Sequence, residues 1–126
     1  MKTFIAVLLS TIIFVIFGFF MQHKIIEFTD KYEKKISIIE NEIQNDNLET
    51  AEKLVNSFID SWQKDINFWY YLLNHEFFDE ITSSIQIIKK SIETQDKIVS
   101  MICIELIKVN LQNILQYEKL DLDHTF

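Results

Sequence analysis

The sequence predicts an all-α protein in which an N-terminal transmembrane helix continues into an antiparallel four-helix bundle. Three observations support this fold class: an uncharged apolar run near the N-terminus, apolar residues that recur every three or four positions after it, and a near absence of turn residues. The 126 residues include one glycine, Gly18, and no proline. Because β-sandwiches and barrels need frequent turns rich in these residues, an all-β fold is excluded.

The N-terminal apolar run covers residues 3–22 and contains no charged residue. Its twenty residues rise about 30 Å as a helix, which matches the hydrocarbon core of a bilayer. A cleaved signal peptide needs small residues after its apolar part, whereas this run ends in the bulky Phe19, Phe20 and Met21. We therefore predict a transmembrane signal anchor over residues 1–24, in preference to a cleaved signal or a buried helix of a soluble protein.

Positive charges lie at both ends of this anchor and bear on its orientation. Lys2 and the N-terminal amine favour a cytoplasmic N-terminus. Four lysines within about 20 residues of the other end favour the opposite orientation, namely Lys24, Lys31, Lys34 and Lys35. Because the chain starts like a signal sequence, we expect a single-pass protein of the cell membrane whose C-terminal domain lies outside the cytoplasm.

Residues 25–126 form the second part of the chain, which we predict to be a helical bundle domain. Ten lysines and nineteen acidic residues give it a net charge of −9, and the chain contains no arginine. An acidic protein without arginine is poorly suited to bind phosphate backbones or guanine, so nucleic-acid binding is disfavoured.

The turns of this domain must form without glycine or proline. We expect them to be built from Asn, Asp, Thr and Gln, with no residue in a special backbone conformation. Asp46 followed by Glu49 resembles a capping box ahead of the second helix, and Asn74 is placed to cap the third.

Apolar residues at helical spacing indicate four helices, which we predict at about 25–44, 48–73, 76–94 and 97–119. Their short connections favour antiparallel neighbours. The inward faces of the first three are predicted to be Ile25, Phe28, Tyr32, Ile36, Ile39 and Ile43; Ala51, Val55, Phe58, Trp62, Ile66, Trp69 and Leu73; and Phe78, Ile81, Ile85, Ile88 and Ile92.

The fourth helix is apolar over a wider arc than the others, so we expect it to be the most buried element. Its predicted inward face is Val99, Ile102, Leu106, Val109, Asn113 and Tyr117. Further apolar positions broaden this face, namely Met101, Ile104, Ile107, Leu111, Ile114 and Leu115. Cys103 is interpreted as a small core residue.

Aromatic residues gather where the second helix returns to the membrane. In an up-down-up-down bundle the second and fourth helices both end near the anchor, so this end receives several rings. Aromatic side chains with a polar tip favour the membrane–water interface. We therefore predict a candidate interface set of Trp69, Tyr70, Tyr71 and Phe77, while core packing is the favoured interpretation of the two tryptophans, Trp62 and Trp69.

One group of residues could carry chemistry. Histidine and carboxylates converge at the membrane-proximal end, and the candidate metal ligands are His75, Asp79, Glu118 and His124. Di-iron bundles repeat Glu-x-x-His on two helices, and that motif does not occur here. The favoured interpretation is that acidic residues complement the dipole at a helix N-terminus, so we expect no cofactor and no enzymatic activity.

The order of motifs along the chain adds a resemblance. An N-terminal span is followed by Trp62 and Trp69, by His75-Glu76-Phe77-Phe78-Asp79-Glu80-Ile81, by Ser84, Ile92 and Asp96, and by Glu118 before a short tail. This order resembles a family of short, single-span membrane proteins of unknown function from clostridia and related spore-forming Firmicutes. The HE-x-x-DEI segment is its most specific part, and the tail from Leu120 to Phe126 departs from it.

The resemblance implies that His75, Glu76, Asp79 and Ile81 are family-typical positions. Members of the family are often encoded beside a multi-span membrane protein, which implies a partner in the bilayer. The sequence thus leads us to expect a membrane-anchored accessory protein that binds the lipid bilayer and an integral-membrane protein. An extracytoplasmic ligand-sensing bundle and a metal-binding bundle are the alternatives.

Overall fold

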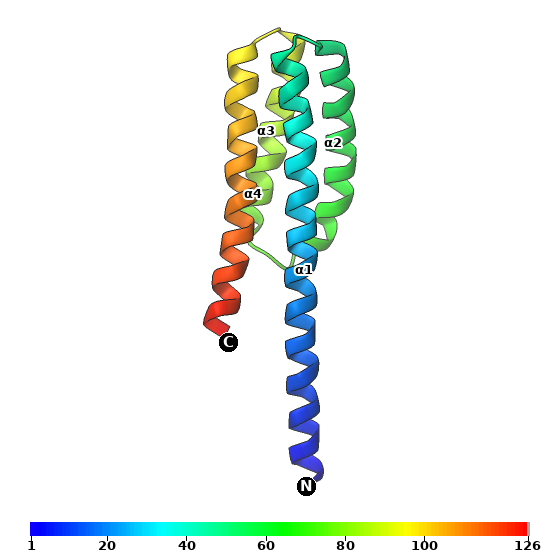
Figure 1. The fold of residues 1–126 in the computed structure, drawn as a ribbon, viewed down its shortest axis with the longest axis vertical. Helices are drawn as coiled ribbons and strands as arrows, with labels where there is room; N and C mark the ends of the chain where they lie inside the picture. Colours follow the sequence, from blue (N-terminus) through cyan, green and yellow to red (C-terminus); the bar gives the residue numbers. More distant parts are fainter. Residues whose placement is uncertain (126) are drawn as a thin grey trace.

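The computed structural model describes the backbone of residues 1–125 and the side chains of residues 1–117, and within this part it contains helices and no strand. The four helices form an elongated bundle with α1 extended below it (Figure 1). Their bounds are Lys2–Gln44 for α1, Leu48–Trp69 for α2, His75–Glu93 for α3 and Lys97–Thr125 for α4. The all-α fold with a long apolar N-terminal helix leading into a bundle is confirmed.

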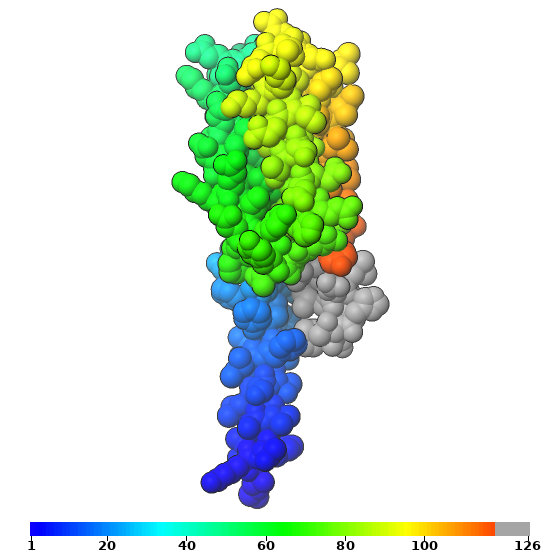
Figure 2. Space-filling model, turned by 180° about the vertical axis from the view of Figure 1, so that it is seen from behind, coloured from blue at the N-terminus to red at the C-terminus, as the bar shows by residue number. Residues whose placement is uncertain are grey.

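Helix α1 runs without a break from the apolar run into the bundle (Figure 1), and Figure 2 shows its N-terminal part as a stalk that projects from the bundle. Its N-terminal part touches few other residues, and its apolar side chains from Phe4 to Phe20 are largely exposed. Helix α1 is long and apolar enough to span a membrane, with a mean hydropathy of 2.8. The stretch Lys97–Tyr117 of α4 meets the same criterion at 1.6, but one face of that stretch is buried in the bundle.

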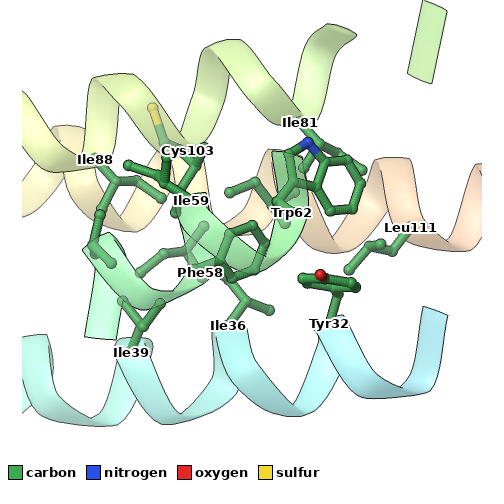
Figure 3. Packing of buried hydrophobic residues seen from close by; sticks show 14 of the residues in the cluster. Tyr32, Ile36, Ile39, Phe58, Ile59, Trp62, Ile81, Ile88, Cys103 and Leu111 are labelled. Atoms are coloured by element: carbon green, nitrogen blue, oxygen red, sulfur yellow. The ribbon is translucent and has the colours of Figure 1, made fainter. Parts of the chain in front are cut away.

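The helices pack as a ring in which each touches two neighbours. Helix α1 packs against α2 and α4, and α3 packs against the same two helices. The side chains inside the ring form one continuous core, and Figure 3 shows its central part, where Phe58 and Trp62 of α2 meet Tyr32 of α1. The inward faces predicted for the first and third helices are buried throughout. The face predicted for the second helix is buried at five of its seven positions and half-buried at Ile66 and at Leu73, which lies beyond the end of α2.

The stripe predicted as the centre of the inward face of α4 is wrong, whereas four of the positions predicted to broaden that face and the predicted core residue Cys103 are buried. The most exposed members of the predicted stripe are Ile102, Leu106, Val109 and Tyr117, while the buried residues are Ser100, Cys103, Ile104, Ile107, Asn110, Leu111 and Ile114. Helix α4 is therefore not the most buried element of the part that the structure describes. The buried face includes Ser100 and Asn110, which donate to the Asp96 and Leu106 carbonyls of the same helical region, and these polar residues made it the less apolar of the two faces.

The two distal turns contain residues in the left-handed region, contrary to the sequence expectation. Asp46 has a φ of 58° and Gln95 a φ of 57°. Each stands just after a helix and completes a Schellman motif, because the following amide donates to the carbonyl five residues back, from Asn47 to Glu42 and from Asp96 to Ser91. The bond lengths are 2.9 Å and 2.8 Å. Glycine normally takes this position, so both turns carry backbone strain.

The helix caps differ from the expected pattern at one place and agree with it at another. Asn47 rather than Asp46 is the N-cap of α2, and no side chain accepts a hydrogen bond there, so the predicted capping box does not form. Asn74 caps α3, because its side-chain oxygen accepts from the Glu76 amide at 3.0 Å. Asp96 caps α4 in the same way through the Val99 amide at 3.1 Å.

Candidate functional site

The end of the bundle that meets the anchor is built by three segments of the chain. Helix α1 emerges from the apolar run, α2 ends, and α3 begins after a five-residue connection over residues 70–74 (Figure 1). The connection stays compact because the Leu72 and Leu73 amides both donate to the Trp69 carbonyl at 3.0 Å. The connection therefore lies at the end of the bundle where the apolar run of α1 enters it (Figure 1).

The aromatic residues predicted at this end divide into two groups. Trp69 is buried and packs against Phe28 of α1, with ring centroids 5.9 Å apart, so it belongs to the core and not to the interface set. Tyr71 is 89% exposed. Tyr70 and Phe77 are half-buried. The interface set as predicted therefore contains one core residue.

Exposed apolar side chains at this end extend beyond the predicted set. Phe68 and Leu72 are exposed beside Tyr71, and Phe68 crosses Trp69 edge to face at 5.0 Å. We call Phe68, Tyr71 and Leu72 the proximal patch. The helical phase could have identified Phe68, because it lies one residue before Trp69 and therefore off the buried face of α2. The position of Tyr71 depends on the connection, which the periodicity does not describe.

His75 stands at the first turn of α3 among exposed groups. Its Nδ1 atom lies 3.2 Å from Asp79 Oδ2, and its ring stacks on Tyr70 with centroids 5.2 Å apart. Both side chains are exposed, so their ion pair contributes little to stability. A shallow depression surrounds the pair, lined by Asn74, His75, Glu76, Asp79, Glu80 and Ser83.

The structure brings together two of the four candidate metal ligands. His75 and Asp79 are neighbours, while the side chains of Glu118 and His124 lie outside the described residues. Among side chains 1–117 no group of three His, Cys, Asp or Glu residues is close enough to hold a metal ion. The described ligands thus form a pair rather than a site.

The family-typical positions expected from the sequence have different structural roles. Ile81 is fully buried in the core. His75 and Glu76 are exposed at the start of α3, where Glu76 complements the positive end of the helix dipole. Asp79 is exposed one turn later and contacts His75. The segment therefore begins a helix and anchors it in the core.

A half-buried polar contact that the sequence did not predict joins α1 to α2. The Tyr32 hydroxyl donates to Asp65 Oδ2 at 2.5 Å, and Lys31 Nζ donates to the same oxygen at 2.8 Å. Burial together with the bond to Asp65 raises the pKa of Tyr32. Burial alone would raise the pKa of Asp65, but the bonds from Lys31 and Tyr32 outweigh it and leave that pKa lowered.

A groove between α1 and α2 lies next to this contact and opens toward the anchor. It combines cations, carboxylates and aromatic rings, and it is lined by Phe20, Lys24, Glu27, Phe28, Lys31, Lys64, Asp65, Phe68 and Trp69. The Lys24 ammonium lies 5.5 Å above the Phe20 ring at the end of the apolar run. A lining of this kind suits an amphipathic partner at a membrane surface.

Comparison with known proteins places the bundle in a family. No curated protein and no solved structure matches the chain. A family model described as a domain of unknown function (DUF4363) matches residues 19–124, which is most of the chain and includes the whole bundle except its last residues. The match begins within the last turn of the apolar run of α1. The chain therefore belongs to the DUF4363 family.

Proposed function

We propose that this protein is a membrane-anchored accessory protein that acts by binding another integral-membrane protein, without catalysis. Residues 1–24 anchor it in the cell membrane, and the bundle over residues 25–126 stands outside the cytoplasm. The observation that supports the proposal most is the proximal patch, where Phe68, Tyr71 and Leu72 are exposed at the end next to the anchor.

The position of the patch explains why the partner would be a membrane protein. Because α1 is continuous, the bundle cannot swing freely about the anchor, and the patch stays close to the bilayer surface. Exposed aromatic residues are favoured both at membrane interfaces and in the centres of protein–protein interfaces. A protein embedded beside the anchor would meet this surface and the adjoining groove directly.

The ionisable groups of the described part support binding rather than catalysis. Cys103 is buried in the core, and this burial raises the pKa of its thiol and favours the unreactive form. His75 is exposed to solvent and contacts Asp79, an arrangement that does not exclude water from a reacting group. The strongest polar network, around Asp65, serves to join two helices.

Site-specific photocrosslinking in native membranes tests the proposal. A photoreactive residue at position 71, in the proximal patch, should crosslink to one integral-membrane protein in stoichiometric yield. The matched control carries the photoreactive residue at Ser57, which is exposed on α2 away from the anchor, and should give no such product. Recovery of the uncrosslinked chain alone from both variants would overturn the proposal.

The compartment of the bundle needs its own experiment. A membrane-impermeant thiol reagent applied to intact cells should label a cysteine placed at Ser57, and buried Cys103 in the unmodified chain should stay unlabelled. Labelling at Ser57 only after the cells are opened would place the bundle in the cytoplasm. The partner would then have to be sought on that side.

A further inference from the structure

Helix α4 has a second apolar face that points away from the bundle. Its residues recur at steps of three and four, at Val99, Ile102, Leu106, Val109, Asn113 and Tyr117, and we call them the α4 outer stripe. Ile102 is 56% and Val109 48% exposed, and Ile98 of α4 and Ile87 of α3 are exposed beside them. A contiguous apolar surface of this length on a bundle marks an interaction site.

The spacing of the stripe identifies the kind of partner. Positions 99, 106 and 113 alternate with 102 and 109 as the a and d positions of a heptad repeat. The buried face of α4, around Ile104 and Leu111, is separate and already packed in the core. A heptad face left outside a completed core fits another helix that runs along it.

The bilayer cannot cover this stripe while residues 1–24 span the membrane. The Lys97 ammonium donates to the Gln44 carbonyl at 3.2 Å, and Lys108 Nζ donates to Glu40 Oε1 at 2.9 Å. These contacts place the N-terminal part of the stripe beside the part of α1 that is farthest from the anchor, and the stripe continues from there toward the other end of the bundle (Figure 1), so the bilayer cannot cover the stripe as a whole. Glu40 lies sixteen residues beyond residue 24, about 24 Å along the helix.

We propose that the α4 outer stripe is the interface of a parallel homodimer in which it packs against the same stripe of a second copy. Two copies inserted through identical anchors stand in the same direction, so their α4 helices run parallel and meet with matching heptads. Confinement to one membrane also raises the effective concentration of each copy for the other.

Asn113 supports a two-stranded parallel arrangement. It occupies an a position near the membrane-proximal end of the stripe, is half-buried, and its amide has no hydrogen-bond partner among the described residues. A single asparagine at an a position pairs with its counterpart across a parallel dimer and fixes the register.

The charges around the stripe favour a second copy over a different chain. Pairing between different helices is selected by complementary charges that flank the a and d positions. Between Ile98 and Tyr117 the charged residues are Glu105 and Lys108, and Lys108 is already bonded to Glu40 of α1. Glu105 alone offers little selectivity for a different chain. The apolar positions of the stripe, in contrast, can pack against the same positions of a second copy.

The dimer goes beyond the proposed function and does not depend on it. The stripe lies on α4, whereas the proximal patch lies at the end of α2 and on the connection after it. Self-association would leave the proximal patch free on both copies. The two proposals can therefore fail separately.

Disulfide trapping of the full chain in native membranes tests the interface. With Cys103→Ala as background, Val109→Cys should give a disulfide-linked dimer under mild oxidation, because a d position faces its own counterpart in a parallel dimer. Ser57→Cys on the exposed face of α2 should remain monomeric under the same conditions. Equal trapping at both positions, or none at position 109, would overturn the proposal.

A charge substitution provides an independent measurement. Ile102→Glu with Val109→Glu places four carboxylates in the dimer interface and should weaken dimerisation more than about 100-fold in detergent micelles. The bundle should still fold, because both side chains are exposed in the single chain, and circular dichroism checks this. The control Ile38→Glu alters an apolar residue that is 53% exposed on α1 and should leave the dimer intact. Unchanged sedimentation of the Ile102→Glu/Val109→Glu variant would refute the stripe as the interface.

Discussion

The membrane-proximal and distal halves of the core are built from different kinds of side chain. The proximal half holds an aromatic cluster in which each ring lies about 5–6 Å from another, formed by Phe28, Tyr32, Phe58, Trp62, Trp69 and Phe78. The distal half is filled by small and branched aliphatic residues, namely Ile36, Ile39, Ile43, Ala51, Val55, Ile88, Ile92 and Ile104. The aliphatic side chains of the distal half pack by the fit of their shapes, whereas the aromatic rings of the proximal half also make contacts whose energy depends on their relative orientation.

Polar atoms sharpen this difference. In the proximal half the Trp62 indole donates to the Thr82 hydroxyl at 2.9 Å, and Tyr32 donates to Asp65. In the distal half the buried polar contact is between the Ser91 and Ser100 hydroxyls, 2.5 Å apart. Hydrogen bonds between large buried groups fix both distance and orientation, so the half next to the anchor is the more rigidly specified. That rigidity holds the proximal patch in place.

The largest effect should follow from removing the central ring of the proximal half. Trp62→Ala should lower the free energy of unfolding by about 3–5 kcal/mol, because Trp62 contacts four other aromatic rings and its truncation leaves a large cavity between them. Ile88→Val in the distal half should cost about 0.5–1.5 kcal/mol. Urea unfolding of the full chain in micelles measures both, and equal costs would show that the two halves contribute alike.

A smaller effect should follow from deleting one hydrogen bond in each half. Tyr32→Phe should cost about 1.5–3 kcal/mol, because the lost bond is to an ionised carboxylate. Ser91→Ala should cost less, about 0.5–1 kcal/mol, since Ser100 still donates to the Asp96 carbonyl at 3.1 Å. The same unfolding assay applies. A larger loss for Ser91→Ala would reverse the order of the two halves.

The Tyr32–Asp65 contact should also depend on pH at both extremes. The lowered pKa of Asp65 gives stability that is present above its unfolded value of 3.8 and is lost as the pH falls through the folded value. The raised pKa of Tyr32 gives stability that is present below 10.0 and is lost as the pH rises toward the folded value. The difference in unfolding free energy between wild type and Tyr32→Phe should therefore be largest at neutral pH. A difference that is constant with pH would contradict the assignment of the bond.

The sequence predicted α1 and α3 well because each has a single apolar face beyond the anchor. In α4 two faces satisfy the same spacing, and periodicity cannot rank them. Ser100 and Asn110 made the true core face look weaker, although Ser100 bonds to Ser91 and the Asn110 amide bonds to the Leu106 carbonyl at 2.9 Å. Which face is buried is decided by contacts with α1 and α3, and those contacts are not local in sequence.

The candidate site was predictable only in part for a related reason. The aromatic residues of positions 68–77 stand close together in the chain, so the sequence could identify this segment, and the predicted Asn74 cap is confirmed. The exposure of Tyr71 follows from the path of the connection after Trp69, and the Tyr32–Asp65 bond joins residues 33 apart. Neither feature leaves a periodic signal.

The smallest effect, and the one with opposite sign, concerns the distal turns. Gln95→Gly should stabilise the bundle by about 1 kcal/mol, because glycine adopts the φ of 57° without the steric cost that glutamine bears. Gln44→Gly makes the same substitution at the last residue of α1 and should destabilise by about 0.5–1 kcal/mol, since glycine lowers helix propensity there. Thermal unfolding of the two variants compares identical chemistry in opposite backbone regions. Destabilisation by both substitutions would mean that the Gln95 side chain stabilises the bundle by more than its strained backbone destabilises it. The left-handed residues of the distal turns would then not lower the stability of the distal half.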